Sequence, residues 1–408
     1  MKTQVIQSTV AQGLLSGFHF ILNLLLIRWW APAQFGLFAL IFTAGFALCS
    51  IHNALINTPY SVCVPARTEP QLLRQTFAWA NILFLLGFGG LIWGLLHLPI
   101  LTTPLLSSEL ICLYFVTRIN REYLRSRWAS ELQLMPMLTA DAAFVGLSLL
   151  GLYGYQSALT ISQLLGLLTL TQVLSCSYLL WHEGQLLQRP SFGNMVREYQ
   201  QVWPQSRWGL VGALSTELQN RGYVIAVSAL FGNGAVGLLQ AGRVFFGPLN
   251  IVASAWTRIA KPTMAKLHSQ QQDRAFIRIL NQGLMAFFIF NVLFGLLLWG
   301  LWPWLQSYLF EQRYLNIGWI TAQWGVVNLL FHLRSTASTA LQAQHQFKPL
   351  ALTTVWGTTV AFIILGVVGW LGDQQLAISA VIFGEATALL LVFWLLHPLW
   401  REARLKHG

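Results

Sequence analysis

Several ionisable side chains lie inside long apolar stretches of this chain. Glu217 and Arg221 are four residues apart in one stretch, which places them on one face of a helix. Arg243 lies in the next stretch and has no acidic residue within four positions. A charged side chain in the middle of a membrane costs about 2.5 to 3.5 kcal/mol, so it usually faces a polar interior or a partner. We expect Glu217 and Arg221 to pair with each other or to release the arginine for an anion, and Arg243 to hold an anion.

The first half of the chain carries its own polar candidates. His52 and Asn53, in the second apolar stretch, either line a cavity or make interhelical hydrogen bonds. Arg28, near the end of the first stretch beside two tryptophans, either contacts a substrate or extends to the membrane interface. Arg118 is interpreted as a loop charge that sets topology or as a residue at a cavity mouth.

Two acidic residues, Asp141 and Glu385, lie alone in further apolar stretches. A lone buried carboxyl group can bind and release a proton, so both are candidates for coupling to H+. Na+ or the membrane potential are the other energy sources that we consider. The sequence predicts no prosthetic cofactor.

The chain lacks the usual signatures of catalysis, metal binding and nucleotide binding. Its four cysteines lie singly, without the spacing of metal ligands. The G-x-G-x-x-G pattern at residues 232–237 joins two apolar stretches instead of a strand and a helix, so we interpret it as a turn. We therefore expect no catalytic residue, no metal site and no enzyme activity.

The elements that position these residues are apolar runs of about 20 residues, the length that crosses a hydrocarbon core of about 30 Å. The chain is 55% hydrophobic and only 9% charged, which leaves little water-facing surface. The pattern predicts an all-α polytopic membrane protein with about 12 transmembrane helices. The expected spans are 10–30, 36–57, 77–98, 105–118, 136–155, 159–181, 208–230, 237–259, 280–301, 319–341, 350–371 and 377–398.

The positive charge of the chain indicates its orientation. The net charge is +11, and the basic residues outside apolar runs fall almost entirely in every second gap between runs. Such a bias marks the cytoplasmic side of a membrane protein. We therefore expect both termini in the cytoplasm and no contact with nucleic acid.

The chain divides into two similar halves. We expect an N-terminal lobe over residues 1–190, a cytoplasmic linker over 191–207 and a C-terminal lobe over 208–408, with six helices in each lobe. Ala33–Ala39 resembles Gly234–Gln240, and each segment opens the second helix of its half. Six crossings return the chain to the same side, so such halves are parallel repeats related by an axis along the membrane normal.

Two segments resemble a known family. Leu24–Leu40, with Arg28 before the turn Ala31-Pro32-Ala33-Gln34-Phe35-Gly36, is similar to the opening of polysaccharide transporters. Asn220–Arg243, followed by Lys261-Pro262, is similar to the seventh and eighth helices of the same proteins. They form the O-antigen flippase-like branch of the multidrug/oligosaccharidyl-lipid/polysaccharide flippase superfamily.

The resemblance implies a V-shaped, two-lobed transporter of the bacterial inner membrane. It implies alternating access for an undecaprenyl-diphosphate-linked oligosaccharide, with Arg28, Arg221 and Arg243 in a cationic cavity. Membrane lipids, a polysaccharide polymerase and glycosyltransferases are the expected partners. The alternatives are a cation-coupled multidrug antiporter of the same fold, which would need an acidic cavity, and a membrane polymerase or glycosyltransferase, which would need a large outer loop or clustered catalytic acids.

Overall fold

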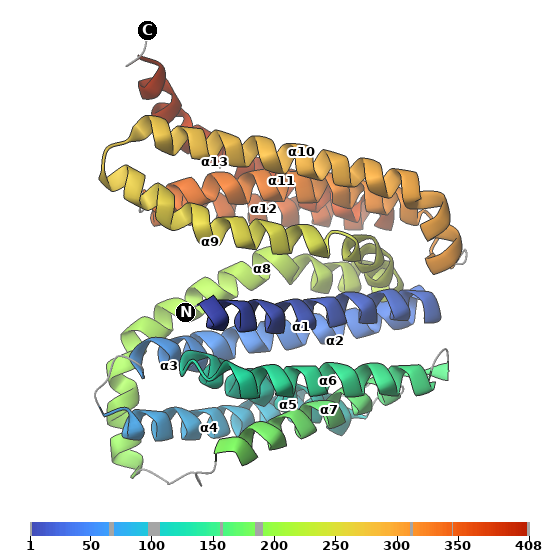
Figure 1. Cartoon of the computed structure of the whole chain (residues 1–408). Helices are drawn as coiled ribbons and strands as arrows, with labels where there is room; N and C mark the ends of the chain where they lie inside the picture. The colour runs from blue at the N-terminus through green and yellow to red at the C-terminus, as the bar shows by residue number, and fades with distance from the viewer. Residues whose placement is uncertain are drawn as a thin grey trace. The chain divides into compact units, whose positions relative to one another are not determined.

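The computed structural model describes residues 2–64, 69–96, 107–155, 158–183, 191–310, 313–344 and 346–405, and over these residues it contains helices and no strands. Figure 1 shows the helices in chain order. They are α1 (Lys2–Trp29), α2 (Pro32–His52), η1 (Asn53–Asn57), α3 (Thr58–Cys63), α4 (Gln71–Leu96), α5 (Ser108–Ser130), α6 (Leu134–Tyr155), α7 (Ile161–Glu183), α8 (Phe192–Val244), α9 (Gly247–Ser269), α10 (Asp273–Leu305), η3 (Gln306–Phe310), α11 (Ile317–Ala343), α12 (Phe347–Leu371), η4 (Gln374–Leu376) and α13 (Ala377–Leu405).

Most of these helices can cross a membrane. Within the described residues, nine helical stretches are long and apolar enough to span it. Helices α5, α9 and α11 are outside this set, although their 23, 23 and 27 residues suffice for a crossing. The chain is thus an all-helical, multi-pass membrane protein, as its composition predicts.

The chain packs into two compact units. Unit 1 consists of Met1–Leu22 and Leu40–Leu218, and unit 2 consists of Asn23–Ala39 and Gln219–Gly408. The end of α1 and the start of α2 therefore belong with the second half of the chain. The expected lobes over residues 1–190 and 208–408 stay a prediction.

In unit 1, α5 packs against α4, α6 and α7 (Figure 1). An aromatic cluster forms part of the core, where the Tyr60 ring lies 5.7 Å from Phe77 and 6.2 Å from Tyr123, both edge-on. Edge-to-face pairs of this kind stabilise a core beyond the area they bury. This packing fixes the position of α5, which carries the candidate Arg118 and also Arg121 and Arg125.

In unit 2, α11 packs against α9, α10 and α13, and α12 packs along α13. Glycines permit the closest approach: a Cβ on Gly357 would lie 2.7 Å from the Gly384 carbonyl oxygen. Without a hydrophobic driving force between helices, small residues of this kind determine membrane helix packing. The close α12–α13 pair supports the face of α11 that carries Arg334.

A local departure from α-helix geometry occurs next to the candidate residue His52. Directly after His52 the chain forms a π-helical turn, Asn53–Asn57, of the kind often found at functional sites. The Tyr199 hydroxyl of α8 donates a 3.0 Å hydrogen bond to the Leu55 carbonyl oxygen in this turn. Burial raises the pKa of the Tyr199 phenol, which keeps it protonated as a donor.

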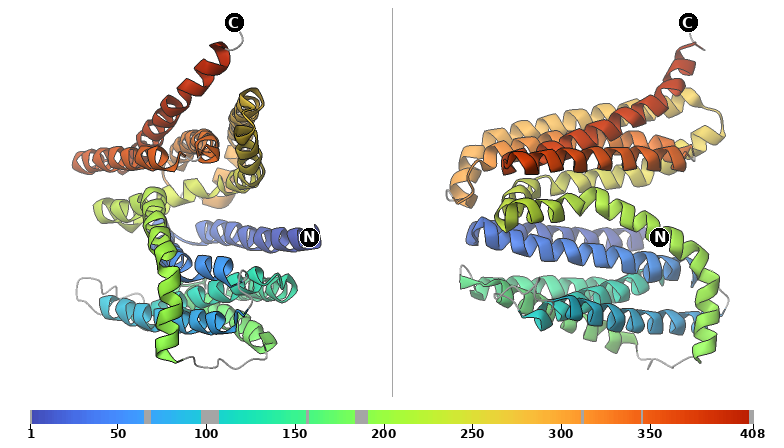
Figure 2. Two further views of the ribbon diagram at one scale, coloured as in Figure 1. Left: turned by 90° about the vertical axis from the view of Figure 1, so that its left-hand side faces the viewer. Right: turned by 180° about the vertical axis from the view of Figure 1, so that it is seen from behind.

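The long helix α8 changes direction along its length. Figure 2 shows its beginning, from Phe192 onward, running across the direction of α4 and α5. Further along, Gly232 has φ 81° and ψ 179°, a conformation that interrupts the helix and suits glycine. The break lies between the predicted spans 208–230 and 237–259, and the turn expected from the glycine-rich pattern is confirmed.

Candidate arginine sites

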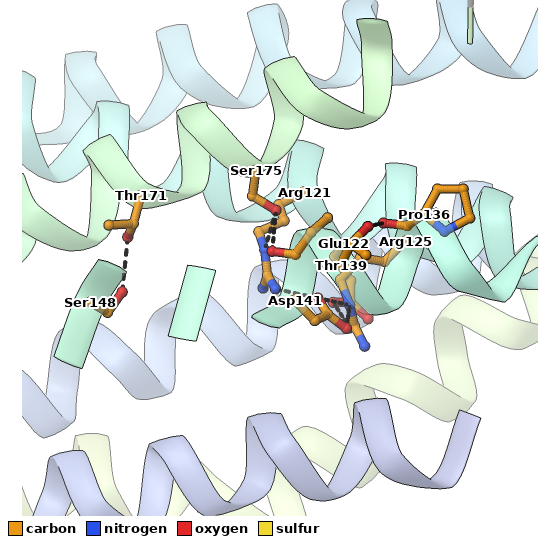
Figure 3. A network of polar contacts seen from close by, with 10 residues as sticks. Arg121, Glu122, Arg125, Pro136, Thr139, Asp141, Ser148, Thr171 and Ser175 are labelled. Carbon is orange, nitrogen blue, oxygen red and sulfur yellow. Dashed lines mark hydrogen bonds and ion pairs between the residues drawn. The ribbon is translucent and has the colours of Figure 1, made fainter. Parts of the chain in front are cut away.

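Some of the arginines in the helices form ion pairs with acidic residues, and we call them the first group. The largest set of such ion pairs is a network in unit 1 (Figure 3). Arg121 pairs with Asp141 and donates a 3.2 Å hydrogen bond from Nε to the Ser175 hydroxyl. The Nε atom of Arg125 lies 2.9 Å from Asp141 Oδ1, and its Nη1 lies 3.0 Å from Glu122 Oε2. Asp141 is completely buried. The two positive and two negative charges of this network balance.

A second ion pair of this group lies in unit 2. The Arg334 guanidinium forms a fork with Glu385, with Nε 2.7 Å from Oε2 and Nη2 3.2 Å from Oε1. Both residues are buried, and such bidentate pairs hold a fixed geometry. Arg334 and Glu385 therefore neutralise each other.

The expectation that Asp141 and Glu385 are lone acids is wrong. The fall in hydropathy predicts an end of the fourth span at Arg118 and a loop for the arginines that follow, whereas α5 continues to Ser130. This extension places Arg121 and Arg125 opposite Asp141 on α6. The proposed role of the two acids in ion coupling stays a prediction. In the structure, both carboxylates are ion-paired with arginines.

A second group of arginines packs on aromatic rings, and Arg118 in α5 is its member in unit 1. The Arg118 guanidinium carbon lies 4.4 Å from the centre of the Phe42 ring and 4.5 Å from that of Phe46. Its Nη1 donates a 2.7 Å hydrogen bond to the Tyr114 hydroxyl. Cation–π contacts stabilise the charge and leave the polar edge of the guanidinium able to bind other groups.

Arg243 has a similar environment in unit 2. Its Nη1 donates a 2.9 Å hydrogen bond to the Tyr223 hydroxyl, which also accepts one from Gln240 at 2.9 Å. The guanidinium carbon lies 5.3 Å from the centre of the Trp324 ring. The Trp324 indole is itself fixed by a 2.8 Å hydrogen bond to the Leu239 carbonyl oxygen. Arg243 is therefore held in position while most of its N–H donors are left for a ligand.

Arg28, at the end of α1, completes the second group. Its guanidinium carbon lies 4.1 Å from the centre of the Tyr308 ring. Arg313 caps the C-terminal end of the same helix, α1. Its Nη1 donates hydrogen bonds to the backbone oxygens of Arg28 and Trp29 at 3.3 and 3.1 Å. A cation at a helix C-terminus is favourable, since the last carbonyl groups carry partial negative charge.

Arg28, Arg118 and Arg243 share one electrostatic property. Over the residues that the structure describes, none of the three pairs with a carboxylate, and each contacts an aromatic ring. All three are half-buried. A guanidinium in this condition has charge and hydrogen-bond donors available for an anion, and its planar fork matches phosphate oxygens.

Glu217 and Arg221 belong to different compact units, because the division of the chain falls between Leu218 and Gln219. Glu217 Oε1 accepts a 2.6 Å hydrogen bond from the Ser50 hydroxyl of α2. Arg221 is half-buried. Whether Arg221 binds an anion and Glu217 restrains it stays a prediction.

His52 and Asn53 lie at the junction of α2 and η1. His52 is completely buried, and its Nε2 lies 2.9 Å from Asn81 Oδ1. Asn53 Oδ1 accepts a 2.5 Å hydrogen bond from Asn57 within the π-helical turn. The His52 contact joins α2 to α4, whereas the Asn53 contact is local to the π-helical turn. A role of either residue in substrate binding stays a prediction.

The sequence analysis missed a polar group in unit 2 formed by Asn250, Asn291 and His332. Each residue lies within or beside a predicted apolar span, which was the available signal. No sequence spacing connects them, because they come from α9, α10 and α11. Among the described residues, no cluster of three or more histidine, cysteine, aspartate or glutamate side chains could hold a metal ion.

The fold is that of known membrane transporters. No protein-family profile matches the chain, and no curated protein sequence matches it. Among solved structures, it is similar to an inward-facing multidrug-resistance MATE transporter of the MOP superfamily, with 13% identity, 99% of each chain covered and a TM-score of 0.68. It is also similar to the lipid II flippase MurJ in an inward closed conformation, with 12% identity, 98% of this chain and 87% of that chain covered, and a TM-score of 0.72.

A third similar structure is a MOP superfamily transporter from Pyrococcus furiosus, with 12% identity, 100% of this chain and 94% of that chain covered, and a TM-score of 0.53. Its description reports a binding pocket of reverse polarity. The expected resemblance to the MOP superfamily is thus confirmed at the level of the fold, which this chain shares with transporters and a flippase.

Proposed function

We propose that this chain is a bacterial inner-membrane flippase. Its substrate is an undecaprenyl-diphosphate-linked oligosaccharide, the repeat unit of a surface or exported polysaccharide. The chain moves this lipid from the cytoplasmic to the outer leaflet by alternating access, and Arg28 and Arg243 of unit 2 bind the diphosphate. Arg118 is the candidate for binding the diphosphate in unit 1. Arg221 is a further candidate for the same role.

The observation that carries the proposal is the division of the arginines into two groups. Asp141 and Glu385 are the buried acids of the described chain, and arginines neutralise both. Within the described ranges, no carboxylate offsets the positive charge of Arg28, Arg118 or Arg243. An anionic head group supplies that partner, and a diphosphate offers several oxygens to the guanidinium forks. An antiporter for cationic drugs needs the opposite polarity, and this chain is less suited to it.

The experiment is reconstitution of the purified chain in liposomes that contain a fluorescent undecaprenyl-diphosphate oligosaccharide. A membrane-impermeant quencher reports the fraction of label in each leaflet. We expect the chain to equilibrate the lipid between leaflets, the Arg243→Ala variant to do so much more slowly, and protein-free liposomes not to do so. Efflux of a soluble cationic dye without lipid movement would favour the antiporter and overturn the proposal.

A further inference from the structure

The polar group missed by the sequence analysis joins three helices of unit 2. His332 of α11 is only 1% exposed. Its Nδ1 lies 3.1 Å from Asn291 Oδ1 of α10, and its Nε2 lies 3.3 Å from Asn250 Oδ1 of α9. Both ring nitrogens therefore face a side-chain amide, one from α10 and one from α9.

The orientation of both amides follows from their other contacts. Asn291 Nδ2 donates a 2.8 Å hydrogen bond to the Phe287 carbonyl oxygen, and Asn250 Nδ2 donates one of 3.2 Å to the Phe246 carbonyl oxygen. Flipping either amide would place its oxygen against a carbonyl oxygen, where neither group can donate. The two atoms that face His332 are therefore both acceptors.

A neutral imidazole cannot satisfy two acceptors. It has one N–H group and one lone pair, so one of its nitrogens would face an amide oxygen without a hydrogen between them. An imidazolium has two N–H groups and satisfies both asparagines. The Phe287 ring, stacked at 5.7 Å with an interplanar angle of 25°, adds a surface that accommodates a cation.

The charged groups of the neighbouring helices lie elsewhere or are already paired. Arg334 and Glu385, on α11 and α13, hold each other. On α9 the nearest charge along the chain is about 12 Å beyond Asn250, and on α10 it is about 20 Å before Asn291, at 1.5 Å per residue. The titratable and charged residues on α9, α10, α12 and α13, which pack against α11, are Arg258, Lys261, Lys266 and His268 of α9, Asp273, Arg274 and Arg278 of α10, Lys348 of α12, and Glu385, His397, Arg401, Glu402 and Arg404 of α13. Helix α8 contacts α11 at Trp324, eight residues before His332, where Arg243 and Tyr223 of α8 lie.

We propose that His332 is a proton-binding site and that H+ is the ion coupled to transport. The proton binds the ring lone pair and breaks no other bond. With the proton bound, the imidazolium donates to Asn250 and Asn291 and joins α9, α10 and α11. With the proton released to water, one nitrogen faces an amide oxygen, and one of the two helix contacts is weakened. The identity of the coupled ion rests on the proposed function, whereas proton binding does not.

The test uses the full chain in lipid nanodiscs with histidine side chains labelled with 15N. The chain has nine histidines, and the signal missing from the His332→Gln variant identifies the residue. We expect that signal to change from one protonated nitrogen to two as the pH falls from about 8.5 to about 5, the range in which histidine ordinarily titrates. A signal that keeps one protonation state across this range would overturn the proposal.

Two variants test the role of the asparagines. Asn250→Leu removes one acceptor, which should lower the proton affinity of His332 about tenfold or more, as loss of a hydrogen bond to a charged group does. Asn250→Asp keeps an acceptor and adds a negative charge, which should raise the affinity. The matched control is His268→Gln, which removes an exposed histidine of α9 and should leave the His332 titration unchanged. An unaltered titration in both Asn250 variants would contradict the proposal.

Transport separates this inference from the proposed function. In the liposome experiment, a pH gradient should change the leaflet distribution of the lipid-linked glycan in the wild-type chain and not in the His332→Gln variant. Titration of His332 without any glycan movement would contradict the proposed function alone. Glycan movement that ignores the pH gradient would contradict coupling through His332 and leave the flippase proposal intact.

Discussion

Gly36 and Gly237 meet backbone to backbone in unit 2. A Cβ on Gly36 would overlap the Asn233 carbonyl oxygen, and a Cβ on Gly237 would overlap that of Pro32. The two glycines hold the same place in the short repeat that opens the second helix of each half. Parallel repeats related by a twofold axis bring equivalent residues together at that axis. The close contact of these two glycines agrees with the expected repeat, which stays a prediction.

Enlarging either glycine should destabilise the protein. We expect Gly36→Ala and Gly237→Ala each to lower the free energy of unfolding by about 1 to 3 kcal/mol, the usual cost of overpacking. Thermal unfolding in detergent measures the effect. Gly234→Ala is the matched control, since a Cβ there meets nothing within 4 Å and should leave stability nearly unchanged. Equal melting temperatures for the three variants would disprove the close contact.

Arg243 should contribute to substrate binding through both its charge and its shape. Arg243→Ala is expected to reduce flipping about tenfold to a hundredfold, as loss of a charge-assisted hydrogen bond does. Arg243→Lys keeps the charge without the fork and should recover only part of the activity. Tyr223→Phe is the control: it removes the hydroxyl that positions Arg243 and keeps the cation, so its effect should be smaller. Full activity of the alanine variant would remove Arg243 from the site.

The ion pairs of Asp141 and Glu385 should contribute to the stability of the folded protein. Asp141→Asn leaves the buried Arg121 without its carboxylate and Arg125 with Glu122 alone, and we expect a loss of about 3 to 5 kcal/mol of stability. For the isolated pair in unit 2, Glu385→Leu should destabilise strongly, while Glu385→Leu combined with Arg334→Leu should restore much of the loss because no buried charge remains. The melting temperature and folded yield report both effects. A stable Asp141→Asn variant that transports without ion coupling would favour the proton-relay hypothesis.

The sequence predicted the apolar elements better than their polar contacts. The predicted break between residues 230 and 237 agrees with the interruption at Gly232, because the glycine-rich pattern is local. The fourth span was predicted to end at Arg118, since hydropathy falls where charges begin. In the structure α5 continues, because Asp141 of α6 neutralises the arginines that follow. Partners from other helices are invisible to a local pattern, and His332 was missed for the same reason.

The orientation of the chain is open to a direct test. The alternating basic residues predict a cytoplasmic location for the start of α8. After replacement of the four native cysteines, a cysteine at Gln200 should be protected from an impermeant thiol reagent added to intact cells and should react after permeabilisation. A cysteine at Leu315, exposed before α11, should react in both cases. The reverse pattern would invert the topology.

The membership of Asn23–Ala39 in unit 2 has a consequence for biosynthesis. This first hairpin turn leaves the ribosome before its packing partners, which begin at Gln219, have been translated. Its helix end is closed by Arg313, and Gly36 is covered by the segment around Gly237, so both contacts must wait for the second half of the chain. Insertion of this segment therefore precedes the formation of its native contacts, and the N-terminal half made alone would retain this unfilled surface.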